Sequence, residues 1–387
     1  MARVMLRVVA LTTLFPDATR PGFASFVERS LLRLAAHPGI ALRVIAPNGV
    51  PPWPLSRRPA YAARGDLPVA EDWKGLRVER PRFALLPGIG WRVNPGLIAR
   101  AAAPLIGEAD VIHADFFFPD GVAAARVGAR LGVPVSIKAR GSDIHLWGAR
   151  ASARRAMLWA AGRAGGLLAV SAAMKSDMVA IGMEAGKIAV HYTGVDLAAF
   201  EPVDRAAVRA AMGWPAPLVV SVGNLIALKG HDVVIRAVAS LPDVHLRVVG
   251  AGPERAALEA LIAALGVRDR VALTGALPHA EVARLLAAAD VMALASAREG
   301  LANAWVEATA CGTPVVATDV GGAAEVIDRP AAGRLAARTP EAFAAAIGAL
   351  LADPPAQAET RAGAARFGWA RHTEQLAAHL MRVAGRD

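Results

Sequence analysis

The chain has 387 residues, of which 55% are hydrophobic and 20% charged, and its formal net charge at pH 7 is +10. This length exceeds one typical core and suits two domains, each with enough apolar residues to bury a core of its own. The single cysteine, Cys311, excludes a disulfide framework, and we find neither an export signal nor an apolar run of about 20 residues, so we expect a cytosolic protein.

The basic charge lies in the first half. Residues 1–200 contain 25 Lys and Arg against 14 Asp and Glu, whereas the remainder contains 18 against 19. Arginines and tryptophans are interspersed between Trp53 and Arg92, a composition that suits a membrane–water interface. An arginine-rich solvated surface has the same composition, and both interpretations stay open. Nucleic-acid binding would rest on this basic half alone, and we do not expect it.

Strand-like apolar runs alternate with helical patterns along the first half. The predicted strands are Val4–Leu11, Ala41–Pro47, Asp110–His113, Val133–Lys138, Gly166–Val170 and Ile188–His191. The predicted helices are Phe23–Ala36, Gly121–Leu131 and Ala151–Ala164. The alternation predicts an α/β fold with a parallel sheet covered by helices on both faces.

The alternation stops near Gly194–Pro202, where turn-forming residues show no periodicity, and we place a domain linker there. It then restarts, with predicted strands at Leu218–Gly223, His245–Gly250, Arg270–Leu273, Val291–Leu294 and Val315–Thr318. The predicted helices are His231–Leu241, Pro253–Leu265, His279–Ala289, Asn303–Ala310 and much of Glu359–Arg386. We therefore expect two doubly wound domains in tandem, whose ligands bind outside the carboxyl ends of the strands.

Lys229 follows one of these predicted strands and stands directly before Gly230 and the next helix. A lysine beside free backbone N–H groups at a helix start forms an anion site. On this segment alone, a lysine on the solvated surface explains the residue equally well.

The segment from Glu299 to Gly322 offers a second constellation. Asn303 is expected to cap a short helix, with Glu299 in the loop before it and Glu307 one turn inside. Carboxylates accept hydrogen bonds from sugar and ribose hydroxyls, and unpaired N–H groups at the helix start donate to phosphate. The segment thus supplies both contacts that a sugar nucleotide needs. A dipole partner at Glu307 and a solvated charge at Glu299 would explain the same residues.

This segment resembles the retaining glycosyltransferases of family four, which have the GT-B fold of two Rossmann-like domains facing a central cleft. The signature residues present are Glu299, Gly300, Asn303, Glu307, Ala308, Gly312, Thr313, Pro314, Gly321, Gly322 and Glu325. Further matches at Ser171–Met178, Gly194–Asp196, Val249–Pro253 and Thr274–Val282 extend the resemblance over nearly the whole chain. It implies an N-terminal acceptor-side domain over residues 1–195, a donor domain over 203–369, and a final helix over about 370–387 that crosses back to complete the first domain.

The resemblance also implies roles for the donor-side residues. Glu299 would hold hydroxyls of the donor sugar, Glu307 the ribose hydroxyls and Lys229 the diphosphate. Asn224 stands where the family often has arginine, so stabilisation of the leaving group would depend more on Lys229 or on Arg140. The expected donor-binding residues are Gly22, Asn224, Lys229, Leu277, Glu299, Gly300, Leu301, Ala302, Asn303 and Glu307.

On the acceptor side, polar residues again follow predicted strands. His113 and Asp115 are candidates for acceptor hydroxyls, although a histidine that ends a strand is often structural. Arg140 stands where many relatives have histidine; it cannot act as a base but can neutralise phosphate bidentately. The expected catalytic residues are Lys229, Glu299, Arg140 and Asp143.

The implied reaction is transfer of a hexose from a nucleoside-diphosphate sugar to an acceptor hydroxyl with retention, needing no metal and no cofactor beyond the donor. The acceptor would be a glycan or lipid-linked molecule of cell-envelope synthesis. Contact with the inner face of the membrane through the basic first domain is a hypothesis that rests on the composition of that domain. A nucleotide-binding epimerase or oxidoreductase is the alternative, but the first strand–helix turn lacks G-x-G-x-x-G.

Overall fold

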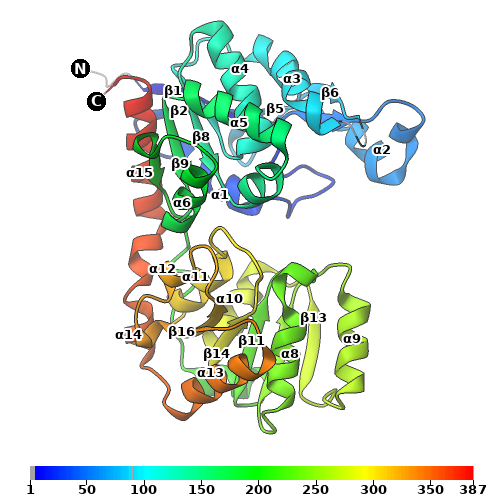
Figure 1. The fold of residues 1–387 in the computed structure, drawn as a ribbon, viewed down its shortest axis with the longest axis vertical. Helices are drawn as coiled ribbons and strands as arrows, with labels where there is room; N and C mark the ends of the chain where they lie inside the picture. The colour runs from blue at the N-terminus through cyan, green and yellow to red at the C-terminus, as the bar shows by residue number, and fades with distance from the viewer. Residues whose placement is uncertain (1–4, 87, 89, 387) are drawn as a thin grey trace. The chain divides into compact units, whose positions relative to one another are not determined.

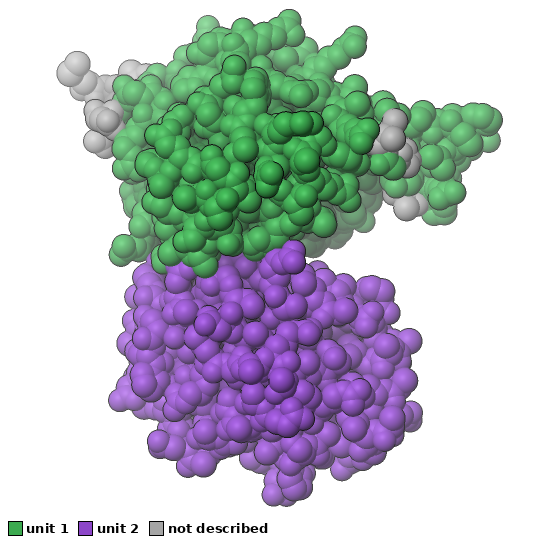
Figure 2. All heavy atoms as spheres, in the orientation of Figure 1, with its two compact units in different colours: residues 1–194, 369–387 green, residues 195–368 purple. Residues whose placement is uncertain are grey.

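In the computed structural model, residues 5–86, 88 and 90–386 are described, and the chain forms two compact units (Figures 1 and 2). Unit 1 comprises Met1–Gly194 and Trp369–Asp387, and unit 2 comprises Val195–Gly368. Val4, the first residue of the first predicted strand, and Asp387, the last residue of the expected final helix, lie outside the described residues.

Unit 1 contains an eight-stranded sheet in the order β10-β9-β8-β7-β1-β2-β5-β4, parallel except for β4, and a separate parallel pair, β3 with β6. Its strands are β1 Leu6–Leu11, β2 Ile40–Ile45, β3 Asn48–Val50, β4 Ala70–Trp73, β5 Leu76–Glu79, β6 Arg82–Ala84, β7 Val111–Ala114, β8 Val135–Ala139, β9 Gly166–Ala169 and β10 Ile188–Val190. Its helices are α1 Ser25–Ala35, α2 Pro59–Gly65, α3 Gly90–Ala102, α4 Val122–Leu131, α5 Ala151–Arg163, α6 Ala172–Ala180 and α15 Trp369–Val383. Helices α3, α4 and α5 pack together, whereas α1 packs against α15, so two layers of helices enclose the sheet (Figure 1).

Unit 2 contains a six-stranded, fully parallel sheet in the order β13-β12-β11-β14-β15-β16. Its strands are β11 Leu218–Val222, β12 His245–Val249, β13 Val271–Gly275, β14 Val291–Leu294, β15 Val315–Thr318 and β16 Gly333–Ala336. Its helices are α7 Arg205–Met212, α8 His231–Ala239, α9 Arg255–Ala264, α10 His279–Ala288, α11 Asn303–Ala310, α12 Ala323–Val326, α13 Pro340–Ala352 and α14 Gln357–Arg361. The strand order reverses between β11 and β14, as it does between β1 and β7 in unit 1. Ligands of such sheets bind at the carboxyl ends of the strands beside this switch point.

The predicted fold class, α/β with two doubly wound parallel-sheet domains, is confirmed. Five short strands were not predicted: β3 to β6 and β16. The two-residue Lys74-Gly75 turn joins β4 to β5. Glu71 and Asp72 in β4 and Arg77 in β5 interrupt the apolar pattern by which a strand would be predicted. No helix in the described part of the chain is both long and apolar enough to cross a membrane.

Helix α15 belongs to unit 1 because its apolar residues complete that unit's core. Leu376, Ala377 and Leu380 are buried against Leu6 and Leu168 of the sheet. Its amphipathic pattern places these residues on one face, at the i, i+1 and i+4 spacing of a helix lying on a core. The chain therefore enters unit 2 at Val195 and returns at Trp369.

The same helix brings two buried histidines into a polar network within unit 1. His372 Nδ1 lies 2.8 Å from the carbonyl oxygen of Tyr192, so it carries the proton, and Nε2 accepts from Ser30 Oγ at 2.8 Å. His379 Nε2 lies 2.9 Å from Ser136 Oγ. Burial lowers the pKa of each imidazole to about 3. Both histidines therefore sit in the core as neutral hydrogen-bonding groups.

We expect this burial to make unit 1 sensitive to acid. His379 binds a proton near pH 6.5 when unfolded but only near pH 3 when folded, so stability is lost as the pH falls through that window. At pH 5 the loss from one such histidine is about 2 kcal/mol. Replacing His379 by Gln, which cannot bind the proton, should reduce the loss between pH 7 and pH 5 by that amount in urea unfolding. An equal loss in both proteins would contradict the assignment, whatever the variant's stability at pH 7.

Candidate functional site

The switch point of unit 2 holds an ion pair between two residues far apart in the sequence. Lys229 ends the turn Ala227–Lys229 after β11, and Glu299 lies in the connection after β14. Lys229 Nζ donates to Glu299 Oε1, which also accepts from Ser296 Oγ at 2.8 Å. The side chains are 19% and 12% exposed, so neither charge is a solvated surface group. No hydrogen bond within the described residues uses Glu299 Oε2.

Backbone and side-chain contacts hold the two connections together. The N–H of Ala297 donates to the carbonyl of Leu228 at 2.8 Å. Arg338, in the connection between β16 and α13, donates from Nε to Ala295 O at 2.8 Å and from Nη2 to Ala227 O at 3.0 Å. Arg338 thereby fixes the spacing between Lys229 and Glu299. No sequence pattern pointed to Arg338, because its hydrogen-bond partners are backbone atoms of distant segments.

The paired glycines that end the predicted segment have a steric purpose. Gly321 has φ +52°, and a Cβ there would lie 2.1 Å from the carbonyl oxygen of Glu299. The N–H of Gly322 donates to Gly300 O at 2.9 Å. A side chain at Gly321 would therefore push the turn away from the loop that carries Glu299.

The start of α11 differs from the prediction. The expected cap at Asn303 is wrong: the N-cap residue is Ala302, no side chain caps the helix, and Asn303 is its first residue. In the described part of the chain, the backbone N–H groups of Leu301 and Ala302 find no protein acceptor. Unpaired N–H groups at the positive end of a helix form an anion site. They lie two and three residues from Glu299.

Glu307 lies one turn inside α11, as predicted. Its Oε1 is 3.1 Å from Nε2 of His279, the first residue of α10. His279 directly follows the loop of half-buried Leu277, so Glu307 and this loop are brought together at one end of the site. Asn224 is exposed in the connection after β11, and its side chain forms no hydrogen bond within the described residues.

In unit 1, Arg140 and Asp115 form an ion pair at the ends of β8 and β7. Arg140 donates from Nη2 to Asp115 Oδ1 at 2.6 Å and from Nε to Asp115 O at 3.0 Å, and its guanidinium lies 4.7 Å from the Phe26 ring centroid. Burial tends to raise the pKa of Asp115, but Arg140 holds it well below the usual range. Arg140 is thus largely committed to Asp115, although Nη1 forms no hydrogen bond within the described residues.

Asp143 holds together the two loops that follow β7 and β8. Its fully buried carboxylate accepts from the backbone N–H groups of Phe117, Arg140, Gly141 and Ile144 at 2.8–3.1 Å. Burial raises its pKa. The side chain therefore orients the loops after β7 and β8 and is not exposed to a ligand.

Two further first-unit candidates are buried as well. His113 Nδ1 lies 3.1 Å from Ser136 Oγ. His113 is 0% exposed and Asp115 is 1% exposed, so neither side chain is accessible to an acceptor substrate. Gly22 is exposed, and a Cβ added there would have no neighbouring atom within 4 Å. Sequence reasoning missed Asp120, which accepts from Thr13 N at 2.7 Å beside the switch point and whose pKa burial raises to about 7.

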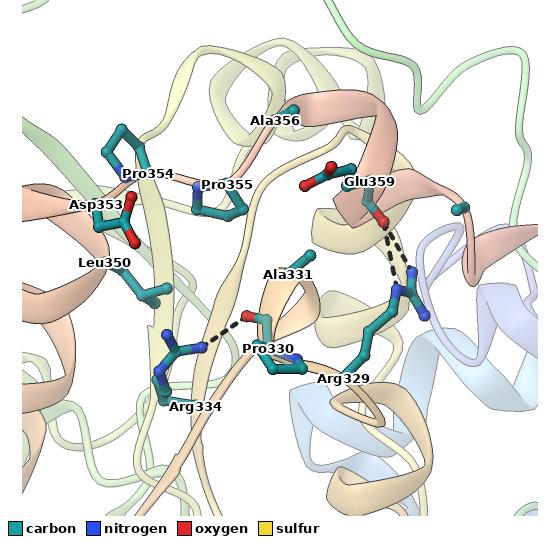
Figure 3. A pocket seen from close by; sticks show the side chains of 11 residues that line it. Arg329, Pro330, Ala331, Arg334, Leu350, Asp353, Pro354, Pro355, Ala356 and Glu359 are labelled. Atoms are coloured by element: carbon teal, nitrogen blue, oxygen red, sulfur yellow. Dashed lines mark hydrogen bonds between the residues drawn. The ribbon is translucent and has the colours of Figure 1, made fainter.

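A pocket of about 630 Å³ in unit 2 lies away from this site (Figure 3). Its lining residues come from the turn before β16, from β16 itself, from the end of α13 and from the segment that continues through α14. Arg329 donates to Glu359 O and Arg334 to Pro330 O, so both guanidinium groups are engaged by backbone carbonyls. Among the described residues, no group of three or more His, Cys, Asp or Glu is placed to hold a metal ion.

Comparison with known proteins follows the division into two units. A family model described as "Glycosyl transferases group 1" matches residues 206–367, and one described as "Glycosyltransferase Family 4" matches residues 25–199. The putative teichuronic acid biosynthesis glycosyltransferase TuaC of Bacillus subtilis (strain 168) is 28% identical over 355 residues, 88% of each chain. The D-inositol 3-phosphate glycosyltransferase of Mycolicibacterium gilvum (strain PYR-GCK) is 39% identical over 202 residues, 49% of this chain, and the match spans about half (46%) of that relative's length.

Solved structures share the fold. HepE of Anabaena in complex with UDP and glucose has a TM-score of 0.74 at 22% identity, with 97% of this chain and 99% of that chain covered. Sucrose-phosphate synthase of Thermosynechococcus elongatus has a TM-score of 0.81 at 22% identity, with 99% and 100% covered.

Proposed function

Because the chain belongs to the glycosyl transferases of group 1 and glycosyltransferase family 4, we propose that it transfers a hexose from a nucleoside-diphosphate sugar to an acceptor hydroxyl, with retention at the anomeric carbon. The observation that carries the proposal is the Lys229–Glu299 pair beside the uncapped start of α11. A cation, a carboxylate and free N–H donors at one switch point match a phosphate joined to a sugar.

The leaving diphosphate gains negative charge in the transition state, and groups fixed around it stabilise that charge. In the proposal Lys229 and the N–H groups of Leu301 and Ala302 serve this purpose. Glu299 Oε1 orients the lysine, while Oε2 accepts a hydrogen bond from a hydroxyl of the donor sugar. The proposed reaction is a front-face substitution without a metal: the acceptor oxygen bonds to the anomeric carbon as the diphosphate leaves it, and the diphosphate accepts the acceptor's proton.

The remaining donor contacts extend along α11. Glu307, next to His279, accepts the ribose hydroxyls, and the loop around Leu277 flanks the base. Gly300 and Asn224 lie in the same two connections and Asn303 begins α11; we propose all three as donor-binding residues, together with Gly22 of unit 1. UDP-sugars are the first donors to test, because HepE was solved with UDP and glucose.

The two expected catalytic residues of unit 1, Arg140 and Asp143, have different proposed roles. Arg140 is the proposed second cation through Nη1, which Asp115 leaves free. Asp143 acts as a positioning residue, because its carboxylate is occupied by four backbone N–H groups.

The name of the relative TuaC supports a role in the synthesis of a polysaccharide, glycolipid or other cell-envelope glycan. No observation favours an epimerase or oxidoreductase.

We place the protein in the cytoplasm, in contact with the inner face of the membrane. The segment before α2 supports this: Trp53 is 72% exposed, and Arg57 and Arg58 are exposed four and five residues later. An exposed tryptophan beside arginines suits the boundary between water and anionic lipid.

The donor site is tested by replacing Lys229 with Ala. Loss of a preorganised charge at the leaving group should lower kcat by roughly 10²- to 10³-fold, measured as release of nucleoside diphosphate from a panel of UDP- and GDP-sugars. Arg268→Ala, which removes an exposed cation before β13, should leave the rate unchanged. The anomeric proton signal of the product reports retention. Full activity in the Lys229 variant, an inverted product, or no nucleotide sugar consumed by the unmodified chain would contradict the proposal.

The membrane contact is tested by sedimentation with vesicles that contain phosphatidylglycerol. At low salt the chain should sediment with them, and salt should release it because the attraction is electrostatic. A variant with Trp53, Arg57 and Arg58 all changed to Ser should remain in the supernatant. Equal sedimentation of both proteins, or of neither, would refute the assignment.

A further inference from the structure

A second concave site lies in unit 1, lined by aromatic side chains. The pocket has a volume of about 230 Å³ and lies between the start of α3 and the turns Phe117–Gly121 and Asp143–Trp147. The ring centroids of Trp91 and Trp147 are 6.3 Å apart, and those of Phe118 and Trp147 are 5.0 Å apart. The volume is below the roughly 300–1,000 Å³ of sites for drug-sized ligands and suits one monosaccharide unit.

Two arginines stand over these rings. The guanidinium carbon of Arg150 lies 4.8 Å from the Trp147 centroid and 5.2 Å from that of Trp91, and Arg92 lies 5.0 Å from Trp91. Both arginines are exposed, and within the described residues neither has a carboxylate at ion-pair distance. A guanidinium carries five N–H donors in one plane, and contact with an aromatic ring does not use them as hydrogen-bond donors. The ring contacts therefore hold the Arg150 guanidinium beside the aromatic walls with N–H donors available for an oxyanion.

The pocket is built on the same connections as the proposed first-unit cation. Phe118 follows β7 and Trp147 follows β8, at the carboxyl edge of the sheet where ligands of this fold bind. The Asp143 carboxylate bonds the N–H of Phe117 in one turn and that of Ile144 in the other. Asp143 thus fixes the two aromatic walls relative to each other.

We propose that this pocket binds the acceptor through a monosaccharide unit that carries a carboxylate or a phosphate. The C–H faces of the sugar ring pack on Trp91, Phe118 and Trp147, and the anionic group accepts paired hydrogen bonds from Arg150, with Arg92 adding charge. A neutral sugar would offer the guanidinium only hydroxyl acceptors, which form weaker hydrogen bonds than an oxyanion does. The inference deepens the proposed function, on which the word acceptor rests, by naming the acceptor's chemical class and its contacts.

The test measures equilibrium binding to the full chain by calorimetry, with glucuronic acid, glucose 6-phosphate and neutral glucose as probes. At least one anionic sugar should bind with a Kd about tenfold or more below that of glucose, since hydrogen bonds to charged groups are the stronger ones. Binding of glucuronic acid alone identifies a carboxylate acceptor, and binding of glucose 6-phosphate alone identifies a phosphate.

Arg150→Gln should raise the Kd of the anionic sugar by about tenfold. The matched control is Arg163→Gln, because Arg163 lies 4.4 Å from the Trp159 ring, outside the pocket. This variant should bind the anionic sugar with an unchanged Kd. Equal binding of neutral and anionic sugars, no binding of any, or equal effects of the two substitutions would overturn the inference. UDP titrated into the same unmodified protein tests the donor site separately, so the proposed function and the acceptor pocket fail independently.

Discussion

The ion pair between Lys229 and Glu299 is the interaction on which the candidate site depends. It exists because the strand order of unit 2 reverses between β11 and β14, which brings two connections 70 residues apart in sequence to one edge of the sheet. Gly321 permits the close turn behind Glu299, and Arg338 braces the backbone on both sides. Half-buried and mutually neutralised, the pair presents a fixed cation beside free N–H donors, the arrangement that a diphosphate requires.

Much of this was predictable from local sequence. Most strands of unit 2 are short apolar runs, so their ends could be predicted. The candidate site residues were then those that directly follow the strands. Lys229, Glu299 and Glu307 lie where the prediction put them, and their meeting follows from the doubly wound topology. The signature glycine Gly321 could be recognised but not explained until its approach to Glu299 O was seen.

The rest depends on contacts between distant segments, which no local pattern encodes. Arg338 donates hydrogen bonds to backbone carbonyls of distant segments. Asp120 accepts from threonines about 107 residues away, and His379 is hydrogen-bonded to a serine 243 residues away. For the same reason Asp143, predicted as catalytic from its position after a strand, is found saturated by backbone N–H groups. The aromatic pocket could not be predicted from the sequence, because Trp91, Phe118 and Trp147 come from three separate elements. In unit 1, Asp120, Asp143 and His379 are thus buried parts of the scaffold, whereas Trp53, Arg92 and Arg150 are exposed.

A crystal structure of the chain with UDP bound would show whether the Lys229–Glu299 pair marks the donor site. We expect density for the diphosphate within hydrogen-bonding distance of Lys229 Nζ and of the N–H groups of Leu301 and Ala302, with the ribose hydroxyls on Glu307. We also expect Glu299 Oε2 to face the open position beyond the distal phosphate, where the sugar would lie. Density for UDP elsewhere, such as the pocket of Arg329 and Arg334, with the Lys229–Glu299 pair untouched, would contradict it.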